Sequence, residues 1–481
     1  MKPVVTPLQM RDIEQRAIAG GVSALLLMER AAEGLVDHLQ QILGPLHGKA
    51  VAFFCGPGNN GGDGLAAARL LRTCGGKPWI VLLDRPVSTE AIHQWEQVQS
   101  LGLSVVVPDA LPPVDAVVDA LFGTGFNRAP GGEAAAMIEH INSLGVPVLA
   151  ADIPSGMDGR GGTVPGVCVH ACRTLSFQWI KAGHLLSHYP EWVGELHAAD
   201  IGLELPGGVS GMLQALEPDD LKRLVPTRPR AAHKGSNGRA LLYCGSPGMA
   251  GAAAMAALGC LRAGAGLTTI ACEEKLFPIL QMLVPNAQCA AIERVVMAPP
   301  RHDVLLAGCG LGVEETTWER LLQLYDPAQP AVLDADALTL LSRHPLKLGG
   351  NTLITPHVGE AARLLKSTVQ AVAADLPAAA QALRQQYGGV VLLKSHCSVI
   401  HDGERTVLNP VGSPVLAKGG SGDALAGMAT ALMAQGLSAF DAGCTASLWL
   451  GRAAQLAEIH MGVHSPLTGE VLQFLGEAQR S

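Results

Sequence analysis

A glycine-rich turn with a single carboxylate stands near the C-terminal end of the chain, where residues 418–427 read Lys-Gly-Gly-Ser-Gly-Asp-Ala-Leu-Ala-Gly. Asp423 ends this turn, and the apolar residues 424–434 that follow are expected to form a helix. The first backbone N–H groups of a helix are unpaired and lie at the positive end of its dipole, so such a turn can hold a phosphoryl group. A carboxylate there repels a bound phosphate but is well placed to take the proton from an attacking hydroxyl. The pattern therefore indicates phosphoryl transfer, and an N-capped, tightly packed helix is the structural alternative.

Three polar clusters follow expected strands in the first half of the chain. Gly56-Pro-Gly-Asn-Asn-Gly-Gly-Asp-Gly64 follows one strand, Asp119 precedes Gly123-Thr-Gly125 after another, and Asp152 begins Asp-Ile-Pro-Ser-Gly156. Ligands of open α/β sheets bind beyond the carboxyl ends of the strands, so the three clusters should converge. The first stands in the place of the dinucleotide fingerprint without matching it, and its side chains offer hard oxygen ligands. Each cluster alone could be a turn with a capping Asp, but the three together favour a binding site.

Composition narrows the class of protein. The chain has 481 residues, of which 48% are hydrophobic and 16% charged, which is typical of a core-rich globular protein of two or three domains. A net charge of −8 and an aromatic content of 4% argue against a nucleic-acid partner. The longest apolar run, residues 249–261, is too short to span a membrane, and no signal peptide is expected at the start. We therefore expect a cytoplasmic protein.

The 11 cysteines are scattered through the chain, which favours buried thiols in a reducing compartment over a disulfide framework. Cys168-Val-His170-Ala-Cys172 gathers three possible metal ligands but lacks the spacing of a zinc site. We expect this segment to belong to the core.

Strand-like runs alternate with helical patterns along the whole chain, which predicts parallel α/β sheets. In the first half, strands are expected at 50–55, 79–83, 104–107, 116–119, 146–151 and 174–177, and helices at 7–19, 23–43, 63–73, 89–100 and 133–143. In the second half, strands are expected at 240–244, 267–271, 304–307, 331–334, 352–354, 390–393 and 398–401, and helices at 250–263, 314–324, 359–366, 378–387, 422–434 and 440–457. A Gly/Pro/Ser run at 203–211 reads as a linker. Two α/β domains are therefore predicted, residues 1–210 with an open doubly wound sheet and residues 215–481.

The first half resembles the NAD(P)H-hydrate epimerase (YjeF N-terminal) domain over residues 1–210. The resemblance is carried by Met28-Glu-Arg-Ala31 and by the three polar clusters after the strands. It implies a Rossmann-like fold and a potassium ion held by Asn60, Asp119 and Ser155. It also implies contacts with the hydrated nicotinamide nucleotide from Asn59, Asn60, Gly61, Gly62, Asp63, Gly123, Thr124, Gly125, Phe126, Asn127, Arg128, Ala129 and Asp152.

Epimerisation of a hemiaminal-type carbon requires reversible C–O cleavage, with a proton moving to and from the leaving hydroxyl. A carboxylate that faces the ring can do this, so we expect Asp152 to be catalytic. Lys181, in Trp179-Ile-Lys-Ala-Gly183, is a second candidate, although we expect its side chain to lie in solvent.

The second half resembles the ADP/ATP-dependent NAD(P)H-hydrate dehydratases, which belong to the ribokinase-like superfamily. The resemblance covers residues 215–481 and is carried by these motifs together with the Gly-Gly-Ser-Gly-Asp turn: His233-Lys-Gly-Ser-Asn-Gly238, Gly245-Ser-Pro-Gly-Met-Ala-Gly-Ala-Ala253, Gly308-Cys-Gly-Leu-Gly312, Thr355-Pro-His-Val-Gly-Glu360 and Lys394-Ser-His. It implies a ribokinase-like α/β/α fold and contacts with the hydrate from Ala252, Gly310, His357 and Asp423. It implies contacts with the nucleotide from Lys394, Ser395, His396, Cys397, Ser398 and Gly422.

Two positions depart from the family pattern. Ser395 stands where glycine is usual after the lysine, which puts the nucleotide contacts of residues 394–398 in question, and Cys309 stands where proline is usual. For His357, a place beside the N-cap of a helix with the ring in solvent is the structural alternative.

The resemblance implies a mechanism for the second half. Asp423 takes the proton of the hydrate's hydroxyl, which attacks the terminal phosphate of ADP while the amides of residues 420–422 hold the oxyanion and magnesium neutralises the nucleotide. Phosphate then leaves and the dihydronicotinamide is restored.

The leading interpretation is a bifunctional repair enzyme that interconverts the R and S hydrates of NADH and NADPH and dehydrates the S form. The alternatives are a vitamin or sugar kinase with a companion domain, and a first domain that binds nucleotide without catalysis. No nucleic acid or membrane is expected as a partner, and a homo-oligomer is expected.

Overall fold

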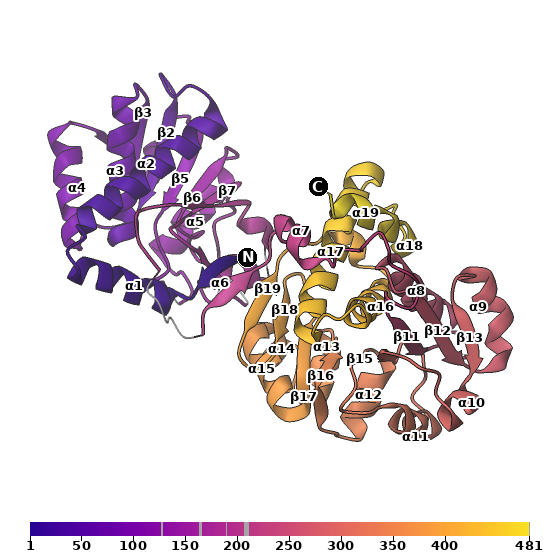
Figure 1. The fold of residues 1–481 in the computed structure, drawn as a ribbon. Helices are drawn as coiled ribbons and strands as arrows, with labels where there is room; N and C mark the ends of the chain where they lie inside the picture. Colours follow the sequence, from indigo (N-terminus) through magenta and orange to yellow (C-terminus); the bar gives the residue numbers. More distant parts are fainter. Residues whose placement is uncertain (127, 163–165, 189, 206–210, 481) are drawn as a thin grey trace. The chain divides into compact units, whose positions relative to one another are not determined.

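The computed structural model describes residues 1–126, 128–162, 166–188, 190–205 and 211–480. The chain forms two compact units (Figure 1), an N-terminal unit of Pro3–Met212 and a C-terminal unit of Leu213–Ser481 with Met1–Lys2. The expected linker, residues 203–211, lies partly outside the described residues.

The N-terminal unit contains a fully parallel sheet in the order β4-β3-β2-β5-β6-β7-β9. Its strands are β2 (Ala50–Cys55), β3 (Lys77–Leu82), β4 (Ser104–Val105), β5 (Ala116–Ala120), β6 (Val148–Ala151), β7 (Arg173–Phe177) and β9 (Glu195–Ala199). The chain builds outward from β2 to β4 and then returns to place β5 on the other side of β2. This reversal confirms the predicted doubly wound sheet, and ligands of such sheets bind where the strand order reverses.

Helices cover both faces of this sheet, because successive side chains of a strand point to opposite faces and the side chains on both faces are buried. Val51, Phe53 and Cys55 of β2 pack on the side of α2 and α3, whereas Ala52 and Phe54 pack on the side of α5. The main helices are α1 (Pro7–Ala19), α2 (Ala24–Leu43), α3 (Asn59–Thr73), α4 (Thr89–Ser100) and α5 (Glu133–Ser143).

Helix α3 begins at Asn59, four residues before the predicted start at Asp63. The glycines of this segment suggested a loop, but they allow the first helical turn to approach the end of β2. A Cβ atom at Gly61 would lie 1.8 Å from the carbonyl oxygen of Gly56. The Asn-Asn-Gly-Gly-Asp segment is therefore the start of the helix, and its N–H groups point beyond the strand ends.

Some short elements near the N-terminal site were not predicted, nor was the edge strand β9. Those near the site are β1 (Lys2–Val5), β8 (Ile180–Lys181) and α6 (Ala182–Leu186). β1 pairs in parallel with β8, and Val5 stands opposite Lys181 in this register. The pairing fixes the backbone of Lys181.

The sheet of the C-terminal unit runs in the order β13-β12-β11-β14-β15-β16-β17-β18-β19-β10. Its strands are β10 (Leu213–Ala215), β11 (Arg239–Tyr243), β12 (Leu267–Cys272), β13 (Gln288–Ala291), β14 (Val304–Ala307), β15 (Ala331–Leu333), β16 (Leu348–Ile354), β17 (Gly388–Leu393), β18 (Ser398–His401) and β19 (Thr406–Asn409). The strand order again reverses, between β11 and β14.

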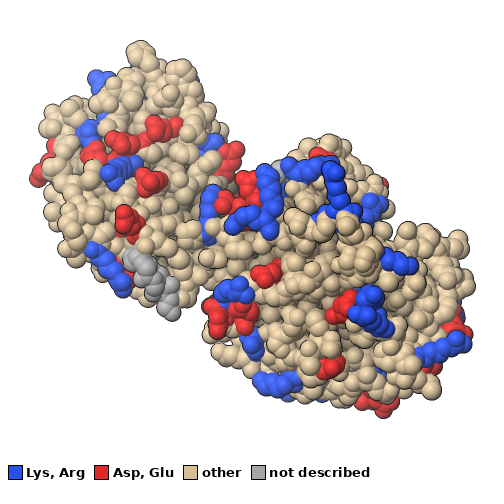
Figure 2. Space-filling model, in the orientation of Figure 1, with Lys and Arg blue, Asp and Glu red and all other residues tan. Residues whose placement is uncertain are grey.

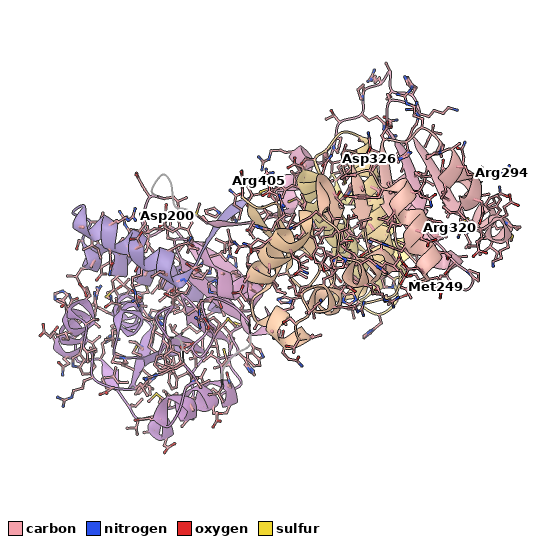
Figure 3. The ribbon with its side chains drawn as sticks, turned by 90° about the horizontal axis from the view of Figure 1, so that it is seen from below. Asp200, Met249, Arg294, Arg320, Asp326 and Arg405 are labelled. Carbon is pink, nitrogen blue, oxygen red and sulfur yellow. The ribbon has the colours of Figure 1, made fainter. Side chains whose placement is uncertain are left out.

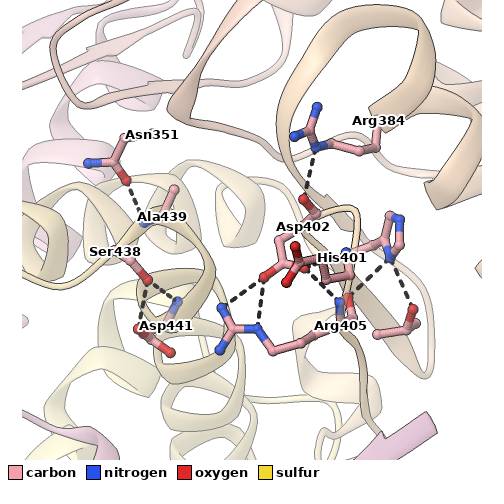
Figure 4. Close-up of polar contacts among 10 residues, drawn as sticks. Asn351, Arg384, His401, Asp402, Arg405, Ser438, Ala439 and Asp441 are labelled. Atoms are coloured by element: carbon pink, nitrogen blue, oxygen red, sulfur yellow. Dashed lines mark hydrogen bonds and ion pairs between the residues drawn. The ribbon is translucent and has the colours of Figure 1, made fainter. Parts of the chain in front are cut away.

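The prediction of parallel pairing was wrong for β17 and β18, which pair antiparallel with each other, and β18 pairs antiparallel with β19, a strand that was not predicted. Only residues 394–397 join β17 to β18, and a parallel crossover needs a dozen or more residues. The turn after β18 is held by side chains (Figure 4). Arg405 Nε donates to Asp402 (2.8 Å), and Arg384 Nε donates to the Asp402 carbonyl (2.9 Å). The Arg405 guanidinium also lies 3.9 Å from the centre of the Phe440 ring at the start of α17.

The helices of the C-terminal unit include one closely packed central pair, α8 and α16. Both consist mainly of small residues, and α16 is buried along most of its length in the main core of this unit. The helices are α7 (Leu221–Leu224), α8 (Ala250–Arg262), α9 (Phe277–Leu283), α10 (Ile292–Met297), α11 (Glu315–Leu324), α12 (Asp336–Arg343), α13 (Val358–Leu364), α14 (Val369–Ala374), α15 (Leu376–Tyr387), α16 (Ser421–Ala434), α17 (Ala439–Met461), α18 (Thr468–Val471) and α19 (Leu475–Ala478).

On the face that Figure 2 shows, acidic and basic side chains are intermixed. Among the described residues, no helix combines the length and the apolar character that crossing a membrane requires.

Candidate active sites

In the N-terminal unit, Asp152 and Lys181 form a buried ion pair. Lys181 is fully buried, and its ammonium group contacts Asp152 Oδ1, Ser176 Oγ (3.0 Å) and the Phe177 carbonyl (2.8 Å). The expectation that Lys181 lies in solvent was therefore wrong. Its carboxylate partner follows β6 and is 8% exposed, so the pair stands at the carboxyl edge of the sheet with restricted access to water.

Two further carboxyl groups face this pair. Burial, Asp152 and Glu14 raise the pKa of Asp63 well above its usual range. Burial and then Asp152 raise the pKa of Glu14 in α1, against the opposing effect of Lys181. Glu14 was not a predicted site residue, although it lies one helical turn after the buried Met10 and beside the buried Ile13. A carboxylate on the apolar stripe of a helix was the signal that could have identified it.

Asp119 and Ser155 lie together at the same edge of the sheet. The Ser155 hydroxyl and backbone N–H donate to Asp119 (2.6 and 2.8 Å), and the Leu121 N–H also donates to it (3.2 Å). Burial raises the pKa of Asp119 to about 6 against these hydrogen bonds. Asn60 lies beside the loop after β5, because a Cβ atom at Gly123 would be 3.3 Å from its side-chain oxygen.

The donor set of these three residues fits a hard cation. The buried side-chain nitrogen of Asn60 is without a hydrogen-bond partner among the described residues, so its amide is not committed to another role. Asn60, Asp119 and Ser155 offer amide, carboxylate and hydroxyl oxygens, which an alkali ion accepts.

The remaining predicted contacts of the N-terminal unit occupy two segments. Asn59 is exposed, and Gly61, Gly62 and Asp63 are buried in the first turns of α3. The loop after β5 holds Gly123, Thr124, Gly125, Phe126, Arg128 and Ala129, whereas Asn127 lies outside the described residues. In this loop the Phe126 ring stacks on Phe122 at 4.1 Å between centroids. A Cβ atom at Gly125 would lie 3.5 Å from the guanidinium of Arg11.

In the C-terminal unit, the Gly-Gly-Ser-Gly-Asp turn leads directly into α16. Gly420 is the N-cap residue with φ +93°, a backbone conformation that favours glycine. The first helical hydrogen bond runs from the Ala424 N–H to the Gly420 carbonyl (2.9 Å), and the Ser421 N–H is directed to the Lys418 carbonyl (3.4 Å). The N–H groups of Gly422 and Asp423 precede the first bonded position of the helix. Lys418 itself donates to the carbonyls of residues 464 and 466, and this holds the turn in place.

Asp423 belongs to a small buried cluster. A carboxylate oxygen of Asp423, one of Asp334 and the thiol sulfur of Cys309 lie within 4.8 Å of one another. Burial and then Asp334 raise the pKa of Asp423 to about 6, against opposing effects of the Cys309 thiol and Lys394. The pKa of Cys309 itself is held well above its usual range by a hydrogen bond with Cys244 and by burial. This is the one group of three potential metal ligands found among the described residues, so the Cys168–Cys172 segment does not form another.

Lys394 connects this cluster to the start of α16. Its ammonium group lies 2.7 Å from Asp334 Oδ1. A Cβ atom at Gly422 would be 3.3 Å from that ammonium group and 3.6 Å from the other Asp334 oxygen. The structure thus brings Lys394, Gly422 and Asp423 together, and Asp334 and Cys309 lie beside them.

The other residues predicted to contact the hydrate lie in two places. Gly310 lies against the start of α8, because a Cβ atom at Gly310 would be 2.8 Å from the Cβ atom of Ala252 and 2.8 Å from that of Met249. Met249 is labelled in Figure 3. His357 caps α13, with Nδ1 accepting from the Gly359 N–H (3.0 Å), and its side chain is 60% exposed. This is close to the structural alternative considered above. Its backbone nevertheless pairs with that of Lys394.

Residues 394–397 form the turn between β17 and β18, and Ser398 begins β18. Ser398 Oγ accepts from the Ser395 N–H (3.4 Å), His396 is exposed, and Cys397 is buried. A ligand at this turn would therefore meet backbone and hydroxyl groups, and the Cys397 thiol faces the core.

Two family models match the chain. One, described as YjeF-related protein N-terminus, matches residues 24–183, and the other, NAD(P)H-hydrate dehydratase, matches residues 240–473. Among solved structures, the chain resembles the ADP/ATP-dependent NAD(P)H-hydrate dehydratase from Bacillus subtilis co-crystallised with ATP and Mg²⁺. The identity is 28%, the TM-score is 0.52, and the match covers 56% of this chain and 98% of that chain. A Streptococcus mutans structure, described as the hypothetic protein SMU.573, is 27% identical with a TM-score of 0.51 and covers 56% and 99%. Both likenesses support the ribokinase-like fold.

Curated relatives match over nearly the whole chain. The bifunctional NAD(P)H-hydrate repair enzyme Nnr of Moorella thermoacetica is 33% identical over 98% of this chain and 96% of its own length. The protein of the same description from Escherichia coli is 34% identical over 88% and 83%. The chain therefore belongs to the family of bifunctional NAD(P)H-hydrate repair enzymes.

Proposed function

We propose that this enzyme repairs hydrated NADH and NADPH in two steps at two sites. Residues 1–210 interconvert the R and S hydrates, and residues 215–481 dehydrate the S hydrate with ADP, which yields NAD(P)H, AMP and phosphate. Family membership supports both activities. The observation that carries the proposal is the presence of two acid–base centres in two units, Asp152 with Lys181 in one and Asp423 with Asp334 in the other.

The Asp152–Lys181 pair suits reversible cleavage of a C–O bond. Lys181 can give a proton to the departing hydroxyl group of the hydrate, which leaves as water. Asp152 can take a proton from the water that returns to the opposite face of the ring and pass it to Lys181 across their ion pair, which restores both groups. Limited access to solvent keeps the intermediate from exchanging with bulk water. The proposed contacts at the start of α3 and in the loop after β5 would hold the nucleotide against this pair.

A potassium ion at Asn60, Asp119 and Ser155 would fix the strand ends and supply positive charge near the bound nucleotide. The chain contributes the oxygen donors described above, and the hydrogen bonds from Ser155 keep Asp119 oriented toward the same edge.

In the C-terminal unit, Asp423 would take the proton of the hydrate's hydroxyl as that oxygen attacks the terminal phosphate of ADP. The transferred phosphoryl group would meet the free N–H groups at the start of α16 and the ammonium group of Lys394. Phosphorylation turns hydroxide into phosphate, a better leaving group. Its departure, together with loss of a proton from the neighbouring ring carbon, forms the ring double bond and restores the dihydronicotinamide.

The nucleotide is proposed to bind along residues 394–398 and at Gly422, and the hydrate against Ala252, Gly310 and His357. Magnesium bound with the nucleotide would neutralise its phosphates, and the carboxylate of Asp334 is a hard ligand of the kind that it accepts.

The test is an assay with a mixture of both hydrates, with ADP or ATP as donor. Recovery of NAD(P)H with release of phosphate is expected. Accumulation of a stable phosphorylated product would instead favour a kinase. We also propose that the enzyme is a cytoplasmic homo-oligomer, which light scattering and cell fractionation would test.

A further inference from the structure

His184 joins the backbones of the two proposed catalytic residues of the N-terminal unit. Its Nδ1 accepts a hydrogen bond from the Lys181 N–H (3.2 Å), and its Nε2 lies 2.9 Å from the carbonyl oxygen of Asp152. Because Nδ1 is the acceptor, Nε2 must carry the proton and donate to that carbonyl. One imidazole therefore connects Asp152 to Lys181, across a sequence separation of 29 residues.

The imidazole is held in a site of fixed geometry. His184 is 3% exposed and lies in α6. Its neighbour Gly183 donates to the Gly159 carbonyl (2.8 Å) and packs directly on the backbone of residues 158–159. Lys181 and Asp152 are the charged groups that face the ring. Burial, and then the charge of Lys181, lower the pKa of His184 to about 4, so the ring stays neutral near pH 7.

Asp152 needs such support because its backbone is strained. Its φ angle is +65°, which is uncommon for a residue other than glycine and persists only where the surroundings hold it. Its N–H donates to the Leu175 carbonyl (2.9 Å), and its carboxylate accepts from the Phe177 N–H (3.1 Å). The hydrogen bond from His184 to the Asp152 carbonyl oxygen fixes a third group of this residue, after its N–H and its carboxylate.

We infer that His184 is a positioning residue for epimerisation, a neutral clamp that sets the carboxylate of Asp152 and the ammonium group of Lys181 in register. The inference rests on the proposed roles of those two residues. In this role the ring neither contacts the substrate nor takes part in proton transfer. It acts by fixing two backbones, so its loss should lower the catalytic rate more than substrate binding.

The test compares four variants in the full-length enzyme. His184→Leu removes both hydrogen bonds, His184→Gln can keep the donor to Asp152, and His184→Asn can keep the acceptor for Lys181. His93→Leu, at an exposed histidine of α4, is the matched control. We expect His184→Leu to lower kcat of epimerisation about 10²-fold, as a misplacement of about 1 Å would, with KM nearly unchanged. His184→Gln should recover much of the rate, and dehydration should be normal in all four.

Two results would overturn the inference. One is a kcat of epimerisation in His184→Leu that equals the wild-type value. The other is a loss of kcat/KM that is equal in His184→Leu and His184→Gln and comes from a higher KM rather than a lower kcat. Should His184→Leu fail to fold, the Gln and Asn variants and the histidine ¹⁵N–¹H spectrum of the native enzyme decide. The spectrum should show a neutral, Nε2-protonated ring between about pH 5.5 and 8.5, given its low pKa. A ring that titrates in that range would contradict the clamp without bearing on whether the enzyme epimerises hydrates.

Discussion

The ammonium group of Lys394 lies 2.7 Å from Asp334 Oδ1, although 60 residues separate the two in sequence. The same ammonium group lowers the pKa of the nearby Asp423, whereas Asp334 raises it. Asp334 is 1% exposed, and this ion pair gives its buried carboxylate a partner. Burial is the largest cause of the raised pKa of Asp423, and the two charges of this neighbouring pair adjust that pKa in opposite directions.

Replacement of Lys394 by Met should therefore move the pH profile of dehydration. Without the positive charge, Asp423 faces Asp334 alone, so its pKa should rise by about one unit. The acid limb of kcat/KM should shift upward by the same amount, in addition to any loss of nucleotide affinity. Lys366→Met, at an exposed lysine, is the control and should leave the profile unchanged. An unshifted acid limb in Lys394→Met would contradict this coupling.

The native enzyme should show the pKa of Asp423 directly. A base with a pKa of about 6 is ionised at pH 7.5 and becomes protonated as the pH falls below 6. Dehydration kcat/KM should be level above pH 7 and fall about tenfold per pH unit well below 6. Asp423→Asn should lose about 10²–10⁴-fold in rate, as expected for a general base. Retention of the acid limb in the residual activity of Asp423→Asn would assign the titration to another group.

The same carboxylate should make the fold less stable at neutral pH. Its folded pKa is raised above the ordinary 3.8, so its contribution to stability is greatest below pH 4 and is lost as the pH rises through about 6. Asp423→Asn removes this cost. The variant should therefore have a higher Tm than the native enzyme at pH 7.5 and about the same Tm at pH 4, by calorimetry. A lower Tm at pH 7.5 would show that the ionised carboxylate stabilises the fold.

Potassium should activate epimerisation and not affect the structure of the dehydration site. We expect the epimerisation rate to fall when potassium is exchanged for choline and to recover on titration with potassium. Since the pKa of Asp119 is raised to about 6, protons should compete below that pH, and more potassium should be needed for half-activation. Ser155→Ala should raise the potassium requirement at every pH. Equal epimerisation rates in potassium and in choline would contradict a role of potassium in this reaction.

Sequence reasoning located the elements that follow simple periodicity. β2, α1, α4 and β14 have the bounds that the sequence predicted, because each has buried residues at strand or helix spacing between clear turn signals. The start of α3 was missed because its glycines are selected for close approach to the end of β2, and glycine alone does not distinguish that role from a turn. The antiparallel β17–β18 pair could have been inferred from the four residues between the strands.

The candidate sites were less accessible to the same reasoning. Asp152 and Asp423 stand beside recognisable glycine-rich segments, whereas Lys181 is buried only because a carboxylate 29 residues earlier folds against it. A lysine considered alone is expected in solvent, since burial without a partner is costly. Asp334, Cys309 and His184 likewise acquire their places through tertiary contacts that no local pattern of residues reveals.

The most direct test of two separate sites follows NAD(P)H recovery from a mixture of both hydrates with ADP, in the native enzyme and in Asp152→Ala and Asp423→Asn. The native enzyme should recover the whole mixture. Asp152→Ala should recover the S fraction at the native rate and then slow to the rate of spontaneous epimerisation. Asp423→Asn should recover almost nothing and still equilibrate the epimers. Full recovery at the native rate in Asp152→Ala, or loss of both activities in a folded Asp423→Asn enzyme, would contradict this account.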